Sequence, residues 1–250
     1  MTVTTLRTDV VGSLHSWDVS TGVDGPGTRF VAFTAGCPLR CAYCHNPDTW
    51  QGRTGRRTKA SAVVEEATRY AAFVAASGGG FTVSGGEPLL QPDFTAALLA
   101  GARGLGMHTA LDTSGFLGWR ASDALLDATD LVLLDIKSWD PATYRRLTGR
   151  GVAPTLEFAR RLARQGTPVW VRFVLAPGWT DDEANVDGVA AFAASLGNVE
   201  RVDVLPYHSL GAAKYAALGL PYPCEETRTP DAALLARVRG QFAAVGLSVV

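Results

Sequence analysis

Six short apolar runs, each followed at once by a polar or glycine-rich motif, constrain the fold of this chain more than any other feature. Stretches with apolar residues at helical spacing separate the runs, so predicted strands alternate with predicted helices. That alternation is typical of a parallel sheet covered by helices, and near-continuous apolar strands indicate burial on both faces. We therefore predict the α/β class, with strands over residues 29–35, 80–83, 108–111, 131–134, 169–175 and 199–205.

The segments between these runs carry the helical spacing. No compositional break, repeat or low-complexity segment divides the chain, so we expect a single domain over residues 1–250. A short last strand is expected over residues 247–250, and helices are expected over 60–76, 92–103, 122–128, 154–165, 182–196 and 231–244.

The motifs that follow the runs can bind a ligand. In parallel α/β folds and barrels, ligands bind at the carboxyl ends of the strands. Six such motifs, one from each strand, are therefore expected to converge on one site. They cover residues 37–44, 84–87, 112–115, 135–137, 177–178 and 206–208.

Charge and hydropathy exclude several classes of function. A formal net charge of −1 gives no indication of a nucleic-acid or membrane surface as the main partner. No apolar stretch approaches the roughly 18 residues of a spanning helix. Residues 1–9 lack the basic and apolar regions of a signal peptide. We expect a cytoplasmic protein, in which clustered cysteines stay reduced and bind metal or do redox chemistry.

Three of the four cysteines lie within eight residues, at Cys37, Cys41 and Cys44. A [4Fe–4S] cube has four irons to satisfy, so three thiolates leave one iron open to a ligand that is not protein. The alternatives are a zinc site, a cluster completed by Cys224 or a histidine, and a disulfide. Zinc sites usually have a second Cys-x2-Cys pair or spaced histidines, but here only the adjacent His45 is available. A reducing compartment disfavours the disulfide.

The spacing Cys-x3-Cys-x2-Cys, with the aromatic Tyr43 before the last cysteine, resembles the radical S-adenosylmethionine (SAM) superfamily. The resemblance implies that the open iron chelates the amino and carboxylate groups of SAM. One electron from the cluster then cleaves the sulfonium and yields a 5′-deoxyadenosyl radical. The protein supplies binding, orientation and exclusion of water, so no catalytic residue is expected beyond the cluster and the cofactor.

The resemblance extends from about residue 10 to the C-terminus. Further motifs are similar to those of the glycyl-radical-enzyme activases, and they cover residues 22–27, 36–50, 78–88, 111–115, 133–137, 169–172, 177–182 and 205–208. The activases imply a partial (β/α)6 barrel, open on one side because the substrate is a protein segment. They also imply an oxidoreductase of anaerobic metabolism that abstracts hydrogen from a glycine Cα of its target.

Many activases carry a cysteine-rich ferredoxin-like insert after the cluster motif. Residues 46–59 of this chain contain no cysteine, so that insert is absent. The absence of the insert makes the chain most similar to the activases whose target is pyruvate formate-lyase. Two alternatives remain open: an activase of another glycyl radical enzyme, including anaerobic ribonucleotide reductase, or a radical enzyme that acts on a small molecule. A third, a non-catalytic zinc or iron–sulfur protein, is disfavoured by the further matching motifs.

The resemblance also assigns residues to the cofactors. The backbone of Gly85 and Gly86 would bind the amino group of SAM, although a plain strand-to-helix turn is the alternative. A monovalent cation, Na⁺ or K⁺, would be held by Asp112, Thr113 and Asp135. An N-cap or turn role is the alternative for Asp112. Further residues implied at the cofactor are Tyr43, Cys44, His45, Asp135, Ile136, Lys137, Arg172 and His208.

Two assignments concern macromolecular partners. Asp24 lies in the sequence Gly-Val-Asp-Gly-Pro-Gly and would hold the substrate peptide, and a Gly-Pro turn is the equal alternative. A flavodoxin or ferredoxin-type donor would supply electrons at a basic rim, for which a solvated charged loop is the alternative. The rim consists of Arg40, Arg53, Arg56, Arg57 and Lys59. A monomer is expected.

Overall fold

The computed structural model describes residues 10–250, so the expected absence of a signal peptide over residues 1–9 lies outside the described residues. The chain forms two compact units. The first contains the chain up to Cys37, Gln51–Thr113 and Trp119–Leu133. The second contains Pro38–Trp50, Ser114–Gly118 and Leu134–Val250. The expected single domain stays a prediction.

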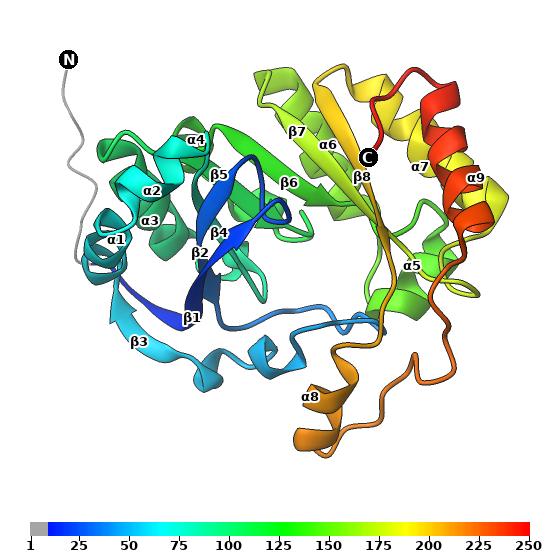
Figure 1. Ribbon diagram of the computed structural model, residues 1–250, viewed down its shortest axis with the longest axis horizontal. Helices are drawn as coiled ribbons and strands as arrows, with labels where there is room; N and C mark the ends of the chain where they lie inside the picture. The colour runs from blue at the N-terminus through cyan, green and yellow to red at the C-terminus, as the bar shows by residue number, and fades with distance from the viewer. Residues whose placement is uncertain (1–9) are drawn as a thin grey trace. The chain divides into compact units, whose positions relative to one another are not determined.

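The first unit is built on five strands that pair in the order β3-β1-β2-β4-β5 (Figure 1). Strand β2 is parallel to β4, and β4 is parallel to β5, whereas β1 is antiparallel to both β2 and β3. The ring of Phe30 stacks between those of Trp17 and Phe81, at centroid distances of 5.1 and 5.4 Å. The strands are β1 (Val11–Thr21), β2 (Thr28–Thr34), β3 (Arg56–Lys59), β4 (Gly80–Gly85) and β5 (His108–Thr113).

Strands β1 and β3 were not predicted from the sequence. Strand β1 mixes polar with apolar residues and its register shifts between Leu14 and Ser16, so it has no continuous apolar run. Strand β3 is basic and largely exposed. Charged, exposed side chains are typical of strands at the edge of a sheet, where they discourage pairing with other chains.

Four α-helices of the first unit follow the expected positions. They are α1 (Ala60–Thr68), α2 (Ala71–Ala76), α3 (Pro92–Gly104) and α4 (Asp123–Asp127). The single helix expected over residues 60–76 is therefore wrong, because the chain breaks it at Tyr70. The ring of Tyr70 packs against Trp17 and Phe30, at centroid distances of 5.6 and 5.7 Å.

The second unit contains the parallel strands β7 (Val169–Leu175) and β8 (Val199–Pro206). Strand β6 (Leu131–Asp135) lies between β5 and β7 in the strand order and runs from the first unit into the second. In place of the expected last strand, Val249 makes an isolated parallel bridge to Val202. The helices are α5 (Pro141–Thr148), α6 (Ala153–Gln165), α7 (Glu183–Leu196), α8 (Ala212–Ala217) and α9 (Ala232–Ala244).

Helices α5 and α8 were not predicted. Helix α5 begins with Asp140 as its N-cap, whose carboxylate accepts a hydrogen bond of 2.6 Å from the Thr143 amide, and ends at the left-handed Gly149. Both are local sequence features that favour a helix of this length. Helix α8 is short and has no side-chain cap.

The structure confirms the predicted α/β class, with an open eight-stranded sheet in the order β3-β1-β2-β4-β5-β6-β7-β8. All six expected strands are present. Among residues 10–250, none of the helices is both long and apolar enough to cross a membrane.

Candidate active site

The three clustered cysteines lie in the loop after β2, and none of them is in a disulfide. Six residues separate the first of them from the last in the sequence. The second part of this loop is tied to the end of α5. The amides of Arg40 and Ala42 donate hydrogen bonds of 2.9 Å to the carbonyls of Thr148 and Leu147.

Burial makes free thiolates costly in this loop. It raises the pKa of Cys41 to about 11, although the charge of Lys137 opposes the rise. Burial also raises the pKa of Cys44, although the neighbouring Asn46 and Trp50 oppose the rise. Coordination to a cation removes this cost, because a metal-bound thiol is deprotonated outright.

The donor set of the loop fits an iron–sulfur cluster. Among the described residues, no three side chains of His, Cys, Asp or Glu converge on a point where they could hold one metal ion. A cube binds each thiolate through a different iron, so its cysteines need not meet at one point.

Tyr43 lies in the apolar core beside the last cysteine. Its ring packs in a cluster with Tyr207 and Cys224, so Cys224 is a fully buried thiol among apolar side chains. The Lys137 ammonium lies 5.7 Å from the centre of the Tyr43 ring. Within the described part of the chain, the buried Tyr43 hydroxyl has no hydrogen-bond partner. Such an orphaned group indicates a missing ligand.

A buried carboxylate and two cations stand at the end of β6 and on β7. Asp135 accepts hydrogen bonds from Lys137 Nζ at 2.9 Å and from Arg172 Nε at 3.0 Å. Burial opposes the charge on Asp135, but Arg172 and Lys137 outweigh it and lower the pKa of Asp135 to about 2. Burial likewise opposes the charge of Lys137, and Asp135 raises the pKa of Lys137 well above its usual value. Ile136 between them is fully buried, and its amide donates to the Arg172 carbonyl at 3.2 Å.

His45 and His208 stack on each other, with ring centroids 4.1 Å apart and planes inclined by 21°. The His45 Nε2 atom lies 3.2 Å from the His208 carbonyl oxygen. Burial lowers the pKa of His45, and the neighbouring His208 lowers it further. The buried Nδ1 of His208 has no hydrogen-bond partner among residues 10–250. It is a second polar atom that a ligand can satisfy.

In the first unit, the motif after β4 has a backbone that only glycine allows. Gly85 has φ of +114°, and a Cβ added there would lie 2.3 Å from the Thr34 amide nitrogen. The amide of Gly86 donates to the Thr34 carbonyl at 2.8 Å. This turn therefore keeps its backbone close to β2, with no side chain at Gly85 to cover it.

The polar residues at the ends of β4 and β5 are bonded in pairs. Asp112 accepts a hydrogen bond of 2.6 Å from the Ser84 hydroxyl, and the Thr113 hydroxyl donates to Glu87 at 2.6 Å. Glu87 is almost fully buried, and its carboxylate also accepts from the Leu89 amide at 3.1 Å. Sequence reasoning placed Glu87 in its motif but did not identify it as the residue that anchors Thr113.

Asp24 lies in the loop between β1 and β2. Its carboxylate accepts a hydrogen bond of 2.5 Å from Ser20, and its carbonyl accepts one of 2.8 Å from Thr82. The amide of Gly22 donates to the carbonyl of Gly27 at 3.3 Å and closes the loop. The carboxylate is half-buried, and its role stays a prediction.

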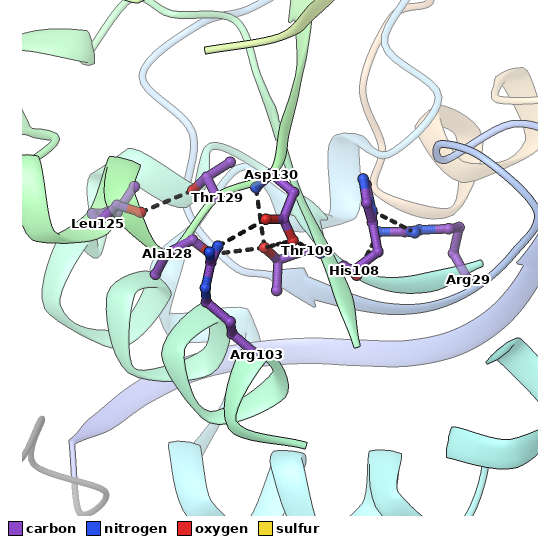
Figure 2. A network of polar contacts seen from close by, with 8 residues as sticks. All are labelled: Arg29, Arg103, His108, Thr109, Leu125, Ala128, Thr129 and Asp130. Carbon is purple, nitrogen blue, oxygen red and sulfur yellow. Dashed lines mark hydrogen bonds and ion pairs between the residues drawn. The ribbon is translucent and has the colours of Figure 1, made fainter. Parts of the chain in front are cut away.

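Sequence reasoning missed a buried charge network under the strands of the first unit (Figure 2). Arg29 is fully buried and donates to the Phe81 carbonyl at 2.7 Å and to the His108 carbonyl at 3.1 Å. Burial lowers the pKa of Arg29 to about 10, against the charge of Asp130. Asp130 in turn accepts from the Thr109 amide at 2.8 Å. The only trace of this network in the sequence is an arginine that opens an apolar run.

Comparison with known proteins places the chain in a family. Residues 31–186 match the model of the Radical SAM superfamily. The chain is 43% identical over 235 residues to a pyruvate formate-lyase-activating enzyme of Listeria monocytogenes, covering 92% of this chain and 95% of the relative. It is 40% identical over 243 residues to the pyruvate formate-lyase 1-activating enzyme of Escherichia coli, covering 96% and 99%.

A solved structure is also similar to this chain. The crystal structure of a domain of a pyruvate-formate lyase-activating enzyme from Bacteroides vulgatus matches with a TM-score of 0.56 and 28% identity, covering 69% of this chain and 98% of that domain.

The chain therefore belongs to the radical SAM superfamily, whose members bind a [4Fe–4S] cluster and SAM. Within the superfamily it belongs to the pyruvate formate-lyase-activating enzymes. The predicted radical SAM fold, a partial (β/α)6 barrel, is confirmed with it. The roles of the individual site residues stay predictions.

Proposed function

We propose that this chain activates pyruvate formate-lyase by abstracting a hydrogen atom from a glycine Cα of that enzyme. The similarity over nearly the whole chain to activating enzymes carries the proposal. The three cysteines Cys37, Cys41 and Cys44 support it, since none is in a disulfide and three thiolates suit a cluster with one open iron.

The three cysteines would hold a [4Fe–4S] cluster. When bound, this cluster supplies one electron for the reductive cleavage of SAM and thereby a 5′-deoxyadenosyl radical. The chain itself moves no proton in the abstraction. Its task is to hold the reacting groups within near-attack distance and to exclude water.

Gly85 and Gly86 would bind the amino group of SAM, because their backbone is not covered by a side chain at Gly85. Lys137 and Arg172 bring two cations to one carboxylate, and this excess of positive charge suits the carboxylate of SAM. The buried Tyr43 hydroxyl and the Nδ1 atom of His208 lack partners in the described chain and would meet the polar atoms of the cofactor.

Asp112, Thr113 and Asp135 would hold a monovalent cation beside the SAM carboxylate. The support is chemical: two carboxylates and a hydroxyl are hard oxygen ligands. Asp112 accepts a hydrogen bond from the Ser84 hydroxyl, and the Thr113 hydroxyl donates one to Glu87.

We also propose an electron donor for the cluster and a residue that contacts the substrate peptide. A flavodoxin or ferredoxin-type donor would reduce the cluster at the basic rim of Arg40, Arg53, Arg56, Arg57 and Lys59, all of which are charged side chains on or near the cluster loop. Asp24 would contact the glycine-bearing peptide. The protein would act as a monomer in the cytoplasm.

Electron paramagnetic resonance of a reconstituted mixture tests the function. Photoreduced protein, SAM and pyruvate formate-lyase should together give a glycyl doublet, and omission of SAM should abolish it. A parallel mixture with anaerobic ribonucleotide reductase serves as the control for the target. A doublet only with that second enzyme would overturn the proposed target, and no doublet with either would overturn the activity.

A further inference from the structure

The hydroxyl of Thr82 ties the loop between β1 and β2 to strand β4. Thr82 is fully buried, and its hydroxyl donates a hydrogen bond of 2.8 Å to the carbonyl of Asp24. The two residues are 58 positions apart in the sequence, and both belong to the first unit. The backbone of Asp24 is therefore fixed by a strand of the sheet and not only by its own loop.

Arg29 sets the direction of this hydrogen bond. The Nε atom of Arg29 donates to the same Thr82 hydroxyl at 3.0 Å. A guanidinium can only donate and a carbonyl can only accept, so the hydroxyl accepts from Arg29 and directs its own proton to Asp24. The charge of Arg29 also polarises the hydroxyl, which strengthens the hydrogen bond to the carbonyl.

Arg29 is itself held on several sides (Figure 2). Its Nη1 atom lies 3.1 Å from Nδ1 of His108, which must accept this hydrogen bond and so carries no proton at Nδ1. Its Nη2 atom donates to the carbonyls of Phe81 and His108. A Cβ added at Gly25 would lie 3.3 Å from Nε of Arg29, so the loop rests on the guanidinium. These contacts restrict the guanidinium, and with it the Thr82 hydroxyl, to one orientation.

The loop also holds its side chains and its far end in place. The Ser20 hydroxyl donates to the carboxylate of Asp24 at 2.5 Å, and the neighbouring Val23 is 64% exposed. At Gly27, which has φ of +64°, an added Cβ would lie 2.5 Å from the Gly79 amide nitrogen, so the backbones touch there. A carboxylate beside an exposed apolar side chain suits a peptide, because it can accept backbone N–H groups while the apolar side chain packs on the peptide.

We propose that Thr82 is a positioning residue that holds Asp24 in the conformation that binds the glycine-bearing peptide of pyruvate formate-lyase. Arg29 orients the hydroxyl of Thr82 for this task. The inference rests on the proposed function, because it requires Asp24 to contact that peptide. A loop that is ordered before binding avoids the entropic cost of ordering it on binding. Thr82 therefore acts on the affinity for the target and not on the chemistry at SAM.

The variant Thr82→Val keeps nearly the same side-chain shape but removes the hydroxyl, so the Asp24 carbonyl loses its donor. The initial rate of glycyl-radical formation, measured by electron paramagnetic resonance over a range of target concentrations, separates KM from kcat. KM for pyruvate formate-lyase should rise about tenfold, and kcat should stay unchanged. Thr82→Ser restores a hydroxyl and should restore the wild-type KM.

The affinity for SAM and the rate of SAM cleavage without target distinguish positioning from a general structural role. Thr82 shares β4 with Gly85, so a distorted strand would weaken SAM binding as well. Both quantities should keep their wild-type values in Thr82→Val, and a loss of SAM affinity as large as the rise in KM would overturn the positioning role.

Thr129→Val is the matched control. Thr129 is also buried in the first unit, but its hydroxyl donates to the Leu125 carbonyl at 2.9 Å, at the end of α4. Its substitution removes one buried hydroxyl without touching the loop and should leave KM unchanged. A rise in KM equal to that of Thr82→Val would show that the effect is not specific to Thr82 and would overturn the inference.

The outcomes separate this inference from the proposed function. A wild-type KM in Thr82→Val would overturn the inference and leave the proposed function intact, whereas no glycyl radical with the wild-type protein would overturn the function. Asp24→Ala removes the contact itself and should raise KM at least as much as Thr82→Val; a wild-type KM there would overturn the inference. If Thr82→Val does not fold, Thr82→Cys takes its place, because a thiol is a weaker donor. KM should then rise by a smaller factor, and an unchanged KM would overturn the inference equally.

Discussion

The ion triad of Asp135, Lys137 and Arg172 gives the most quantitative prediction. The Asp135 side chain is 19% exposed, and the two cations lie at 2.9 and 3.0 Å from its oxygens. A fall of its pKa from 3.8 to about 2 corresponds to roughly 2–3 kcal/mol in favour of the charged form. The variant Asp135→Asn removes this stabilisation and leaves two buried cations without their anion, so we expect a loss of roughly 2–4 kcal/mol.

The thermal midpoint of the protein without SAM measures this loss. For a chain of this size it should fall by roughly 5–15 °C at pH 7. Asp127→Asn is the matched control, because Asp127 is exposed on α4, and its substitution should leave the midpoint nearly unchanged. Equal midpoints for wild type and Asp135→Asn would refute the reasoning that the triad stabilises the fold.

The pH dependence of the same difference has a defined sign. The pKa of Asp135 is lower in the folded chain than in the unfolded chain, so its contribution is complete above about pH 4 and is lost as pH falls toward about 2. The difference between wild type and Asp135→Asn should therefore shrink over this range. Cluster-free protein is used here because acid releases iron. A difference that stays constant from pH 5 to pH 2 would contradict the low pKa.

Three further substitutions have expected outcomes. Gly85→Ala places a Cβ 2.3 Å from the Thr34 nitrogen at φ of +114°, so it should lower the free energy of unfolding by about 3 kcal/mol or more and weaken SAM binding. Gly104→Ala is the control, because a Cβ there meets open space and should change neither quantity. Wild-type SAM affinity of Gly85→Ala in a calorimetric titration would contradict this expectation. Arg29→Lys cannot donate at once to the Thr82 hydroxyl and the Phe81 carbonyl, as Nε and Nη2 of Arg29 do, and should cost roughly 2–4 kcal/mol in thermal or urea unfolding. A loss below about 1 kcal/mol would show that the network is dispensable. Cys224→Ala should keep about four irons per chain by metal analysis while losing about 1 kcal/mol of packing, and a loss of iron would make Cys224 a ligand.

The strands could be predicted from sequence where their residues form a nearly continuous apolar run. The run Val169–Leu175 matches β7 at both ends, because its residues are apolar apart from Arg172. The edge strands β1 and β3 could not be predicted in the same way. Arg56–Lys59 pairs with β1 through its backbone, and its side chains carry no apolar pattern that would indicate a strand.

In the candidate site, too, local sequence patterns could be predicted, whereas contacts between distant residues could not. The cysteines were visible because their spacing is local, whereas Arg172 was assigned to the site only through the family resemblance. The contacts of Tyr215 were not visible, since its hydrogen bond to Cys41 joins residues 174 positions apart. Contacts of that kind depend on the fold, and one sequence without its structure does not contain them.

The Arg29 network was missed for a related reason. An arginine at the start of an apolar run reads as the boundary of a strand, where a charge is normally solvated. The structure instead buries Arg29 fully and satisfies its guanidinium with carbonyls of neighbouring strands. Only the pairing of β2, β4 and β5 creates those acceptors.

The fate of the abstracted hydrogen tests the central claim most directly. Pyruvate formate-lyase prepared with dideuterated glycine is mixed with reduced, reconstituted protein and SAM, and the 5′-deoxyadenosine formed is analysed by mass spectrometry. Our account predicts that 5′-deoxyadenosine carries a deuterium atom taken from the glycine. Formation of 5′-deoxyadenosine without deuterium, while a glycyl radical appears on the target, would contradict direct abstraction by this enzyme.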